Sequence, residues 1–312
     1  MDLLFLGSSD FSVPFLDALY CSHNNISMVI TYPDMPQGRG KRLLANPVKK
    51  KAAELGLRIL EAKKIGKKEI SSLSGEKFNG AVVVSCGIIL PESFLSLVPH
   101  RCINVHPSLL PRYRGPSPIT GALKNGDELT GVSIMEVTPQ LDAGPVFSQT
   151  IIKIDKKDNK DKLKFKLVKI GCPLLEATLG LIENNNLDSF DQDESRATYT
   201  FRLERKDLQI EWDQKSSQIN NNIRAYSASP GCYCYLDKKR IKILQAELPA
   251  DRRGKNLPPG TIIDIHNQQG IEVQCGQNTN IWLQVLKPEN KNSMHFKDFL
   301  NGYRLKPGDS FG

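Results

Sequence analysis

Short apolar runs alternate with amphipathic segments along the first half of the chain. The apolar runs predict strands at Leu3–Leu6, Ser27–Thr31, Ala81–Ser85, Cys102–Val105 and Val132–Val137. The amphipathic segments predict helices near Phe11–Tyr20, Pro47–Leu55, Pro118–Lys124 and Lys162–Ile182. This alternation is typical of α/β folds, so we predict a Rossmann-like, mostly parallel sheet wrapped by helices.

The pattern changes after residue 183. A polar stretch rich in Asn, Asp, Gln and Ser predicts a linker over residues 184–205. Beyond it the apolar runs are short and separated by turns, as in a small OB-like β-barrel. Its predicted strands are Tyr233–Leu236, Ile241–Leu244, Thr261–Ile265, Ile271–Val273 and Ile281–Val285. We therefore predict a sheet domain over residues 1–183 and a β-barrel domain over residues 206–312.

The composition agrees with two globular domains in a reducing compartment. The chain has 312 residues, 39% of them apolar, and no apolar run long enough to span a membrane. Its N-terminus lacks the pattern of a secretory signal. The seven cysteines show neither disulfide nor metal-ligand spacing. We expect a cytoplasmic protein with free thiols, no metal site and no membrane contact.

The net charge of +8 is concentrated in one segment of the first domain. Residues 34–68 hold eleven Lys or Arg and three acidic residues, so this segment carries the whole excess. Such a charge favours a polyanionic partner such as nucleic acid. A solvated helix face is the alternative interpretation of any Lys-rich run.

Candidate chemistry lies at the end of the fourth predicted strand. Asn104 and His106 are two residues apart, so on a strand their side chains leave the same face. The proline-rich loop that follows restricts the backbone. Asp142 lies in a second polar turn, after the fifth strand. An amide, an imidazole and a carboxylate suit acyl transfer to an amine, although Asn104 and His106 alone could be a structural pair.

Other chemistries lack their sequence signals. No serine or cysteine with a neighbouring base suggests a covalent nucleophile, which favours direct attack by an amine. The dinucleotide fingerprint and the phosphate loop are both missing after the first strand, where Gly7-Ser8-Ser9-Asp10 stands instead.

The motifs around these residues resemble those of folate-dependent formyltransferases. The resemblance rests on Asn104, on His106-Pro107-Ser108-Leu109-Leu110-Pro111 and on Leu141-Asp142-Ala143-Gly144. It implies that Asn104, His106 and Asp142 are the catalytic residues, with 10-formyltetrahydrofolate as the co-substrate. The residues that it implies for the folate site are Gly87, Ile88, Ile89, Leu90, Ser108, Leu109, Leu110 and Pro111.

Two features are similar to the methionyl-tRNA formyltransferases within that superfamily. One is the basic segment from Pro33 to Lys49, which resembles that family's tRNA-contacting insertion. The other is the second domain, with Arg224-Ala225-Tyr226 before Ser229-Pro230-Gly231. The resemblance implies formyl transfer to the α-amino group of initiator methionyl-tRNA for translation initiation. It implies tRNA contacts by Arg39, Lys41, Arg42 and Lys49, and we expect a monomer.

Two departures and two alternatives accompany this interpretation. Cys86 stands where the family commonly has tyrosine, and Ser227-Ala228-Ser229-Pro230 replaces a more usual Asn-Pro turn.

A formyltransferase acting on a small amine, such as an amino sugar nucleotide, would have the same reacting residues. A non-catalytic RNA-binding protein would keep the fold without the reaction. The basic segment argues against the first and the three polar residues against the second.

Overall fold

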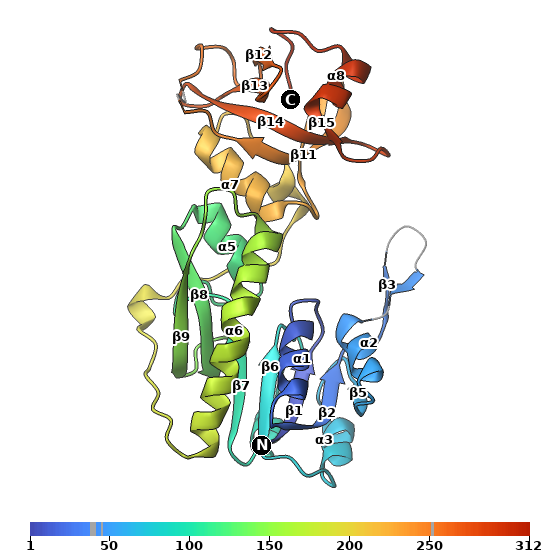
Figure 1. Ribbon diagram of the computed structural model, residues 1–312, viewed down its shortest axis with the longest axis vertical. Helices are drawn as coiled ribbons and strands as arrows, with labels where there is room; N and C mark the ends of the chain where they lie inside the picture. Colours follow the sequence, from blue (N-terminus) through green and yellow to red (C-terminus); the bar gives the residue numbers. More distant parts are fainter. Residues whose placement is uncertain (38–41, 45, 251–252) are drawn as a thin grey trace. The chain divides into compact units, whose positions relative to one another are not determined.

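The computed structural model describes residues 1–37, 42–44, 46–250 and 253–312 and contains two compact units (Figure 1). The first unit consists of Met1–Pro118, Leu129–Lys153 and Lys164–Phe201. The second consists of Ile119–Glu128, Ile154–Leu163 and Arg202–Gly312. The polar stretch interpreted as a linker therefore lies mostly with the first unit, as far as Phe201.

A mostly parallel sheet organises the first unit. Its strands in chain order are β1 (Asp2–Gly7), β2 (Asn25–Thr31), β5 (Ile59–Glu61), β6 (Gly80–Val84), β7 (Arg101–His106), β8 (Leu129–Glu136) and β9 (Val146–Lys153). Their order across the sheet is β5-β2-β1-β6-β7-β8-β9. The first five strands in this order pair in parallel, whereas β8 and β9 are antiparallel additions. The predicted α/β class is confirmed.

Helices bury the sheet on both faces. Leu3, Leu4, Phe5 and Leu6 of β1 are all fully buried, although successive side chains of a strand point to opposite faces. Figure 1 shows α1 and α6 over the visible face. The helices of this part of the chain are α1 (Val13–Cys21), α2 (Pro47–Glu54), α3 (Lys67–Leu73), α4 (Glu92–Leu95), α5 (Pro118–Asn125) and α6 (Lys160–Glu183). The predicted helices correspond to α1, α2, α5 and α6.

The sequence pattern missed the two outermost strands of the sheet. β5 has only three residues, too few for a periodic signal. β9 is longer, but most of its residues after Phe147 are partly or fully exposed. Because an edge strand has one neighbour and less cover, its residues need not be apolar.

An antiparallel sheet forms the core of the second unit, as predicted for this half of the chain. Its strands are β10 (Cys232–Leu236), β11 (Lys239–Glu247), β12 (Ile262–His266), β13 (Gly270–Cys275), β14 (Thr279–Pro288) and β15 (Met294–His295). Their order is β10-β11-β14-β13-β12, with β15 paired to β14. Two helices that the sequence did not predict, α7 (Ser216–Tyr226) and α8 (Phe296–Tyr303), bury apolar side chains in the same core. Cys232 and Cys234 are buried there too.

None of the described helices combines the length and the apolar character that a membrane crossing requires.

Candidate active site

Asn104 and His106 project from the end of β7, in the centre of the first sheet. β7 pairs with β6 on one side and with β8 on the other. Since β8 is antiparallel to β7, it ends beside Ile103, and the connection to β9 that follows brings Asp142 next to Asn104 and His106. Two segments far apart in sequence thus meet near the carboxyl end of β7. Ligands of α/β folds usually bind at the carboxyl ends of the strands.

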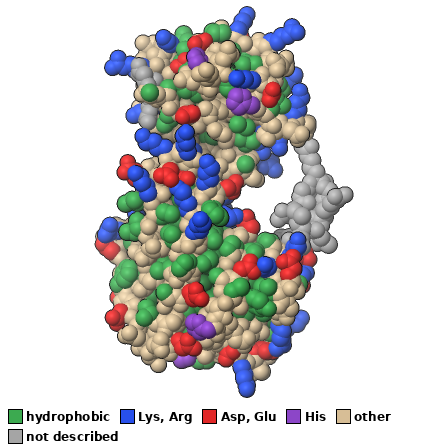
Figure 2. Space-filling model, in the orientation of Figure 1, with side chains coloured by type: hydrophobic (Ala, Val, Ile, Leu, Met, Phe, Trp, Pro, Cys, Tyr) green, Lys and Arg blue, Asp and Glu red, His purple; other side chains and the backbone are tan. Residues whose placement is uncertain are grey.

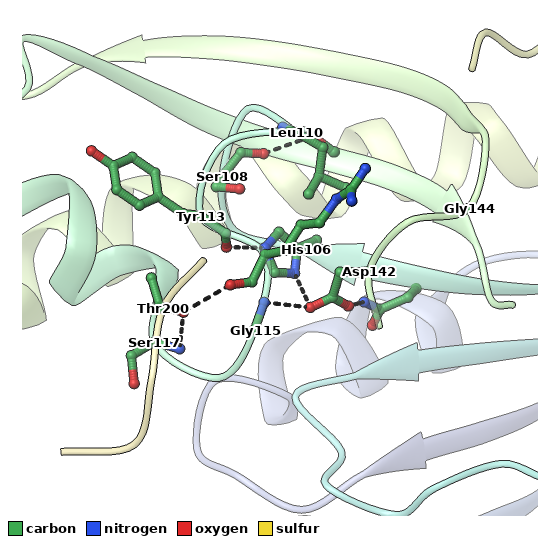
Figure 3. Close-up of polar contacts among 12 residues, drawn as sticks. His106, Ser108, Leu110, Tyr113, Gly115, Ser117, Asp142, Gly144 and Thr200 are labelled. Carbon is green, nitrogen blue, oxygen red and sulfur yellow. Dashed lines mark hydrogen bonds and ion pairs between the residues drawn. The ribbon is translucent and has the colours of Figure 1, made fainter. Parts of the chain in front are cut away.

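The three predicted reacting side chains lie together. The Asp142 carboxylate has Oδ2 3.7 Å from His106 Nδ1 and Oδ1 3.5 Å from Asn104 Nδ2. The same Oδ2 accepts a hydrogen bond of 2.7 Å from the backbone N–H of Gly115 (Figure 3). The His106 and Asp142 side chains are only 5% and 14% exposed. Asp142 is therefore held mainly by Gly115, and its contacts with the other two are long enough to rearrange.

The backbone of the loop after β7 fixes the hydrogen-bonding state of His106. Its Nε2 lies 2.9 Å from the carbonyl oxygen of Tyr113. Because a carbonyl can only accept, Nε2 must carry a hydrogen and donate. Nδ1, the other ring nitrogen, faces Asp142. When Nδ1 is protonated, it can donate to this carboxylate or to a substrate oxygen placed between them.

Two glycines permit the close packing of the loops around Asp142. Gly115 has a φ of +101°, and a Cβ there would lie 2.5 Å from the carbonyl oxygen of Thr200. At Gly144, a Cβ would lie 2.0 Å from the carbonyl oxygen of Glu136. Any side chain at either position would push apart segments that hold Asp142.

The proline-rich loop is held by its own Ser108 and by polar side chains of β8 and β9. Ser108 is buried, and its hydroxyl donates to the carbonyl of Arg112 at 2.6 Å. The Ser133 hydroxyl donates to the Ser108 carbonyl at 2.6 Å, and Gln149 donates to the Leu110 carbonyl at 2.9 Å. Leu110 itself packs with Met135 and Val146. Leu109 and Pro111 are partly exposed.

The second loop predicted to contact folate leaves the neighbouring strand β6 at the same edge. Gly87 and Ile89 are exposed, the latter by 86%, whereas Ile88 is buried and Leu90 packs against the same core. Burial raises the pKa of the Cys86 thiol. An aromatic ring lies beside this loop: Tyr32, at the end of β2, would be 3.5 Å from a Cβ built on Gly87.

The basic residues predicted to contact tRNA lie in sequence within or shortly after a hairpin of β3 (Met35–Gln37) and β4 (Arg42–Leu44). Arg39, Lys41 and the side chain of Arg42 lie outside what the structure describes. Lys49 is on α2, with Nζ 2.8 Å from Asp34 and 3.0 Å from Glu61. The hydrogen bond from Lys49 lowers the pKa of Asp34, and its bond to Asp34 raises the pKa of Lys49.

Asn46 ties the base of this hairpin to the sheet. Its backbone N–H donates to Asp34 and its side chain to the carbonyl of Tyr32, both at 3.0 Å. Its side-chain oxygen accepts from Val48 and Lys49, so Asn46 also caps α2. The hairpin is thus anchored at both ends by described residues.

Several residues around the site were not anticipated from the sequence. Tyr113 and Gly115 contact His106 and Asp142 through backbone groups, which carry no side-chain signature. Gln192, from the predicted linker, donates to the carbonyls of Asp142 and Gly144 at 2.9 and 2.7 Å. Only its position in a polar run was visible in the sequence. Within the described residues, no three His, Cys, Asp or Glu side chains gather in the way a metal site requires.

Comparisons with known proteins cover the whole chain. Residues 1–178 match the formyl transferase family and residues 202–304 match the formyl transferase C-terminal domain. A methionyl-tRNA formyltransferase from Dictyoglomus turgidum is 39% identical, over 100% of this chain and 99% of its own length. One from Bacillus velezensis is 35% identical, over 99% of this chain and 97% of its own.

Solved structures share the fold at lower identity. The N-formyltransferase from Helicobacter canadensis, in complex with folinic acid and dTDP-3-aminofucose, aligns with a TM-score of 0.65 at 19% identity, covering 91% of this chain and 99% of its own. HypX from Aquifex aeolicus, in complex with tetrahydrofolic acid, aligns at 0.63 and 14%, covering 99% of this chain and 48% of its own. The N-formyltransferase from Helicobacter canadensis and HypX share only the fold, whereas the methionyl-tRNA formyltransferases are 35–39% identical over nearly their whole length. The chain therefore belongs to the methionyl-tRNA formyltransferase family.

Proposed function

We propose that this chain transfers the formyl group of 10-formyltetrahydrofolate to the α-amino group of initiator methionyl-tRNA, with Asn104, His106 and Asp142 at the reacting centre. One observation supports the assignment of these three residues: the side chains of Asn104 and His106 both lie within 3.7 Å of the Asp142 carboxylate. The chain that carries them belongs to the methionyl-tRNA formyltransferase family. The product is N-formylmethionyl-tRNA, which serves translation initiation.

The reaction starts with direct attack by the amine. An α-amino group ordinarily has a pKa of roughly 7.7 to 8.0, so part of it is neutral at pH 7. Its nitrogen forms a bond to the formyl carbon, and the formyl oxygen takes up negative charge. Asn104 Nδ2 is a side-chain donor that faces the centre, and His106 Nδ1 is a second one when both ring nitrogens carry a proton, since Nε2 is engaged by Tyr113. They stabilise the oxyanion.

Collapse of this intermediate requires the transfer of one proton. The carbon–nitrogen bond to folate breaks, and the folate nitrogen must receive a proton as it leaves. The attacking nitrogen must lose one. Asp142, with a water molecule, relays this proton because its carboxylate is adjacent to both donors. The backbone N–H of Gly115 holds one oxygen of the Asp142 carboxylate in place during this proton transfer.

Folate binding is assigned to the two loops that leave β6 and β7. The exposed surface of Gly87 and Ile89 and the partly exposed Leu109 and Pro111 support contacts with the co-substrate. Ile88, Leu90, Ser108 and Leu110 are directed into the protein and shape the loops from behind. Structural neighbours bound to folinic acid and tetrahydrofolic acid support a folate compound as the donor.

The basic hairpin and the second unit supply the tRNA contacts. Arg39, Lys41 and Arg42 neutralise phosphates near the acceptor end. Lys49 contributes only by exchanging one of its two carboxylate partners for a phosphate. Figure 2 shows Lys and Arg side chains at several separate places on the visible face of the second unit, which supports a salt-sensitive, sequence-independent contribution.

Formylation of an amino sugar nucleotide is the competing function. The neighbour that binds dTDP-3-aminofucose supports it by fold, but at 19% identity. The 39% identity to a methionyl-tRNA formyltransferase, over the full length of both chains, supports the aminoacyl-tRNA instead. We further propose that the chain acts as a cytoplasmic monomer.

One assay distinguishes these functions. The protein is incubated with 10-formyltetrahydrofolate and either initiator methionyl-tRNA or an amino sugar nucleotide, and the products are analysed by mass. We expect formylation of the methionyl-tRNA alone. Formylation of the sugar nucleotide, or of neither acceptor, would overturn the proposal.

A further inference from the structure

The segment after α6 crosses the catalytic loops. We call residues 190–200 the strap. At one end Phe190 exchanges two backbone hydrogen bonds with Val146, of 2.9 and 3.0 Å. At the other end Thr198 and Thr200 exchange backbone hydrogen bonds with Arg114, of 2.9 and 2.7 Å. The strap is therefore hydrogen-bonded both to the start of β9 and to the loop that follows His106.

Gln192 is the third residue of the strap and contacts both catalytic loops. Its Nε2 donates to the carbonyl oxygens of Asp142 and Gly144, at 2.9 and 2.7 Å. Its Oε1 accepts from Arg114 Nε at 3.1 Å. The residue is only 8% exposed. Both amide hydrogens and the amide oxygen are therefore used, each by a different group.

Arg114 determines which way this amide is oriented. A guanidinium only donates, so the oxygen of Gln192 must face it and the nitrogen must face the two carbonyls. Arg114 is itself fixed, because it is 1% exposed and its two terminal nitrogens bind Glu194 at 2.9 and 2.6 Å. Its Nη1 also donates to the hydroxyl of Tyr199 at 3.0 Å. A buried cation with this many partners is hard to displace.

Asp142 depends on such support from its surroundings. Its φ is +50°, in the left-handed region that is uncommon for residues other than glycine, although Asp is found there more often than most. Its carboxylate accepts from Gly115, the residue directly after Arg114. The network thus holds Asp142 at two points, at its own carbonyl through Gln192 and at its carboxylate through the loop that carries Arg114.

We propose that Gln192 is a positioning residue that sets the Asp142 carboxylate against His106, and that Arg114 orients Gln192 for this task. The proposal rests on the function proposed above for Asp142. Gln192 need not touch either substrate, because it acts through the backbone of Asp142.

The test is a set of variants of the full-length protein in steady-state formylation of methionyl-tRNA. Gln192→Glu keeps the size and the acceptor for Arg114 but loses both donors. Since a displacement of about 1 Å can reduce a rate about a hundredfold, we expect kcat to fall by roughly 10- to 100-fold. Both KM values should stay within about twofold. Asp193→Asn, the matched control on the strap, should retain the parental kcat.

A double-mutant cycle separates this proposal from the function on which it rests. If Gln192 acts through Asp142, Gln192→Glu added to Asp142→Asn should cause little further loss of kcat. Full additivity of the two losses, a loss confined to KM, or an unchanged kcat in Gln192→Glu would overturn the positioning role. High activity in Asp142→Asn alone would instead overturn the proposed role of Asp142.

A second variant covers the case in which Gln192→Glu does not fold. Arg114→Lys keeps a cation for Glu194 but removes the planar donor to Gln192. We expect a fall in kcat of the same kind, at unchanged KM, and a shift of the His106 ring signals in NMR spectra of the folded variant. Parental kcat and parental ring signals in folded Arg114→Lys would overturn the proposal.

Discussion

Single residues of this site acquire a function only through their neighbours. Asn104 and His106 are on one strand, and either could serve as a buried hydrogen-bonding side chain. The carboxylate of Asp142 lies 3.5 Å from the one and 3.7 Å from the other, and the acyl-transfer role that we propose for the three residues depends on this proximity. The removal of either donor should therefore affect the reaction more than the fold.

We expect Asn104→Ala and His106→Ala to lower kcat by about a hundred- to thousandfold, the usual effect of removing one oxyanion donor. tRNA affinity should stay the same, because neither residue belongs to the basic hairpin. The measurements are single-turnover formylation and direct tRNA binding, with circular dichroism as the check of folding.

The control variant is Asp188→Asn, since Asp188 is exposed on the polar stretch before the strap. It should behave like the parent protein in both assays. Near-full activity in either Asn104→Ala or His106→Ala would remove these residues from the reaction.

Different elements of the first unit carry the groups proposed to react and the hairpin proposed to bind tRNA. β6, β7 and the β8–β9 connection bring the reacting groups together, whereas the β3–β4 hairpin projects from the end of β2 and is anchored by Asn46. Because Asn46 and Lys49 tie the base of the hairpin, its basic residues can be changed without disturbing the sheet.

Replacing Arg39, Lys41 and Arg42 with Ala should weaken tRNA binding. It should also reduce the slope of log affinity against log salt, because fewer phosphate contacts release fewer counterions. Folate affinity should be unaffected. The measurement is tRNA binding over a series of salt concentrations.

Three exposed lysines near α3, Lys63, Lys67 and Lys68, provide the control because their replacement with Ala removes the same charge. If both triple variants bind tRNA equally well and with equal slopes, net charge rather than the hairpin governs binding.

The seven cysteines of the whole molecule differ in exposure, and six of them lie within the packed interior of the two units or at its margin. Cys21 is exposed, whereas the other six of the seven cysteines are buried or partly buried. Burial raises the pKa of Cys102 and of Cys232 to about 12 and of Cys172 to about 11. A higher pKa leaves less thiolate at a given pH, and the thiolate is the reactive form.

We therefore expect one thiol of the native protein, Cys21, to react rapidly with a disulfide reagent at about pH 8. The remaining thiols should react only after unfolding in denaturant. Cys21→Ser should abolish the rapid phase. A rapid phase that persists in this variant would indicate that another thiol, such as Cys86, is accessible in the native state.

The two fold classes and the central strands could be predicted from the sequence alone, and the sequence also supplied a candidate set of reacting residues. Central strands must be apolar on both faces because helices cover them, and this leaves continuous runs such as that of β1. These candidates could be selected because Asn104 and His106 are close in sequence and the flanking motifs resemble a known family. The basic hairpin was visible for the same reason, as a local concentration of charge.

The contacts that hold the site together could be seen only in the folded structure. Gln192 and Asp142 are fifty positions apart, and their contact runs through a backbone carbonyl that no residue type reveals. The ion pairs of Lys49 and the positions of Tyr113 and Gly115 likewise depend on which segments meet after folding. The physical reason is the same in each case. Periodicity and motifs record which side chains are apolar or reactive, whereas hydrogen bonds to the backbone between distant segments leave no periodic trace in the sequence.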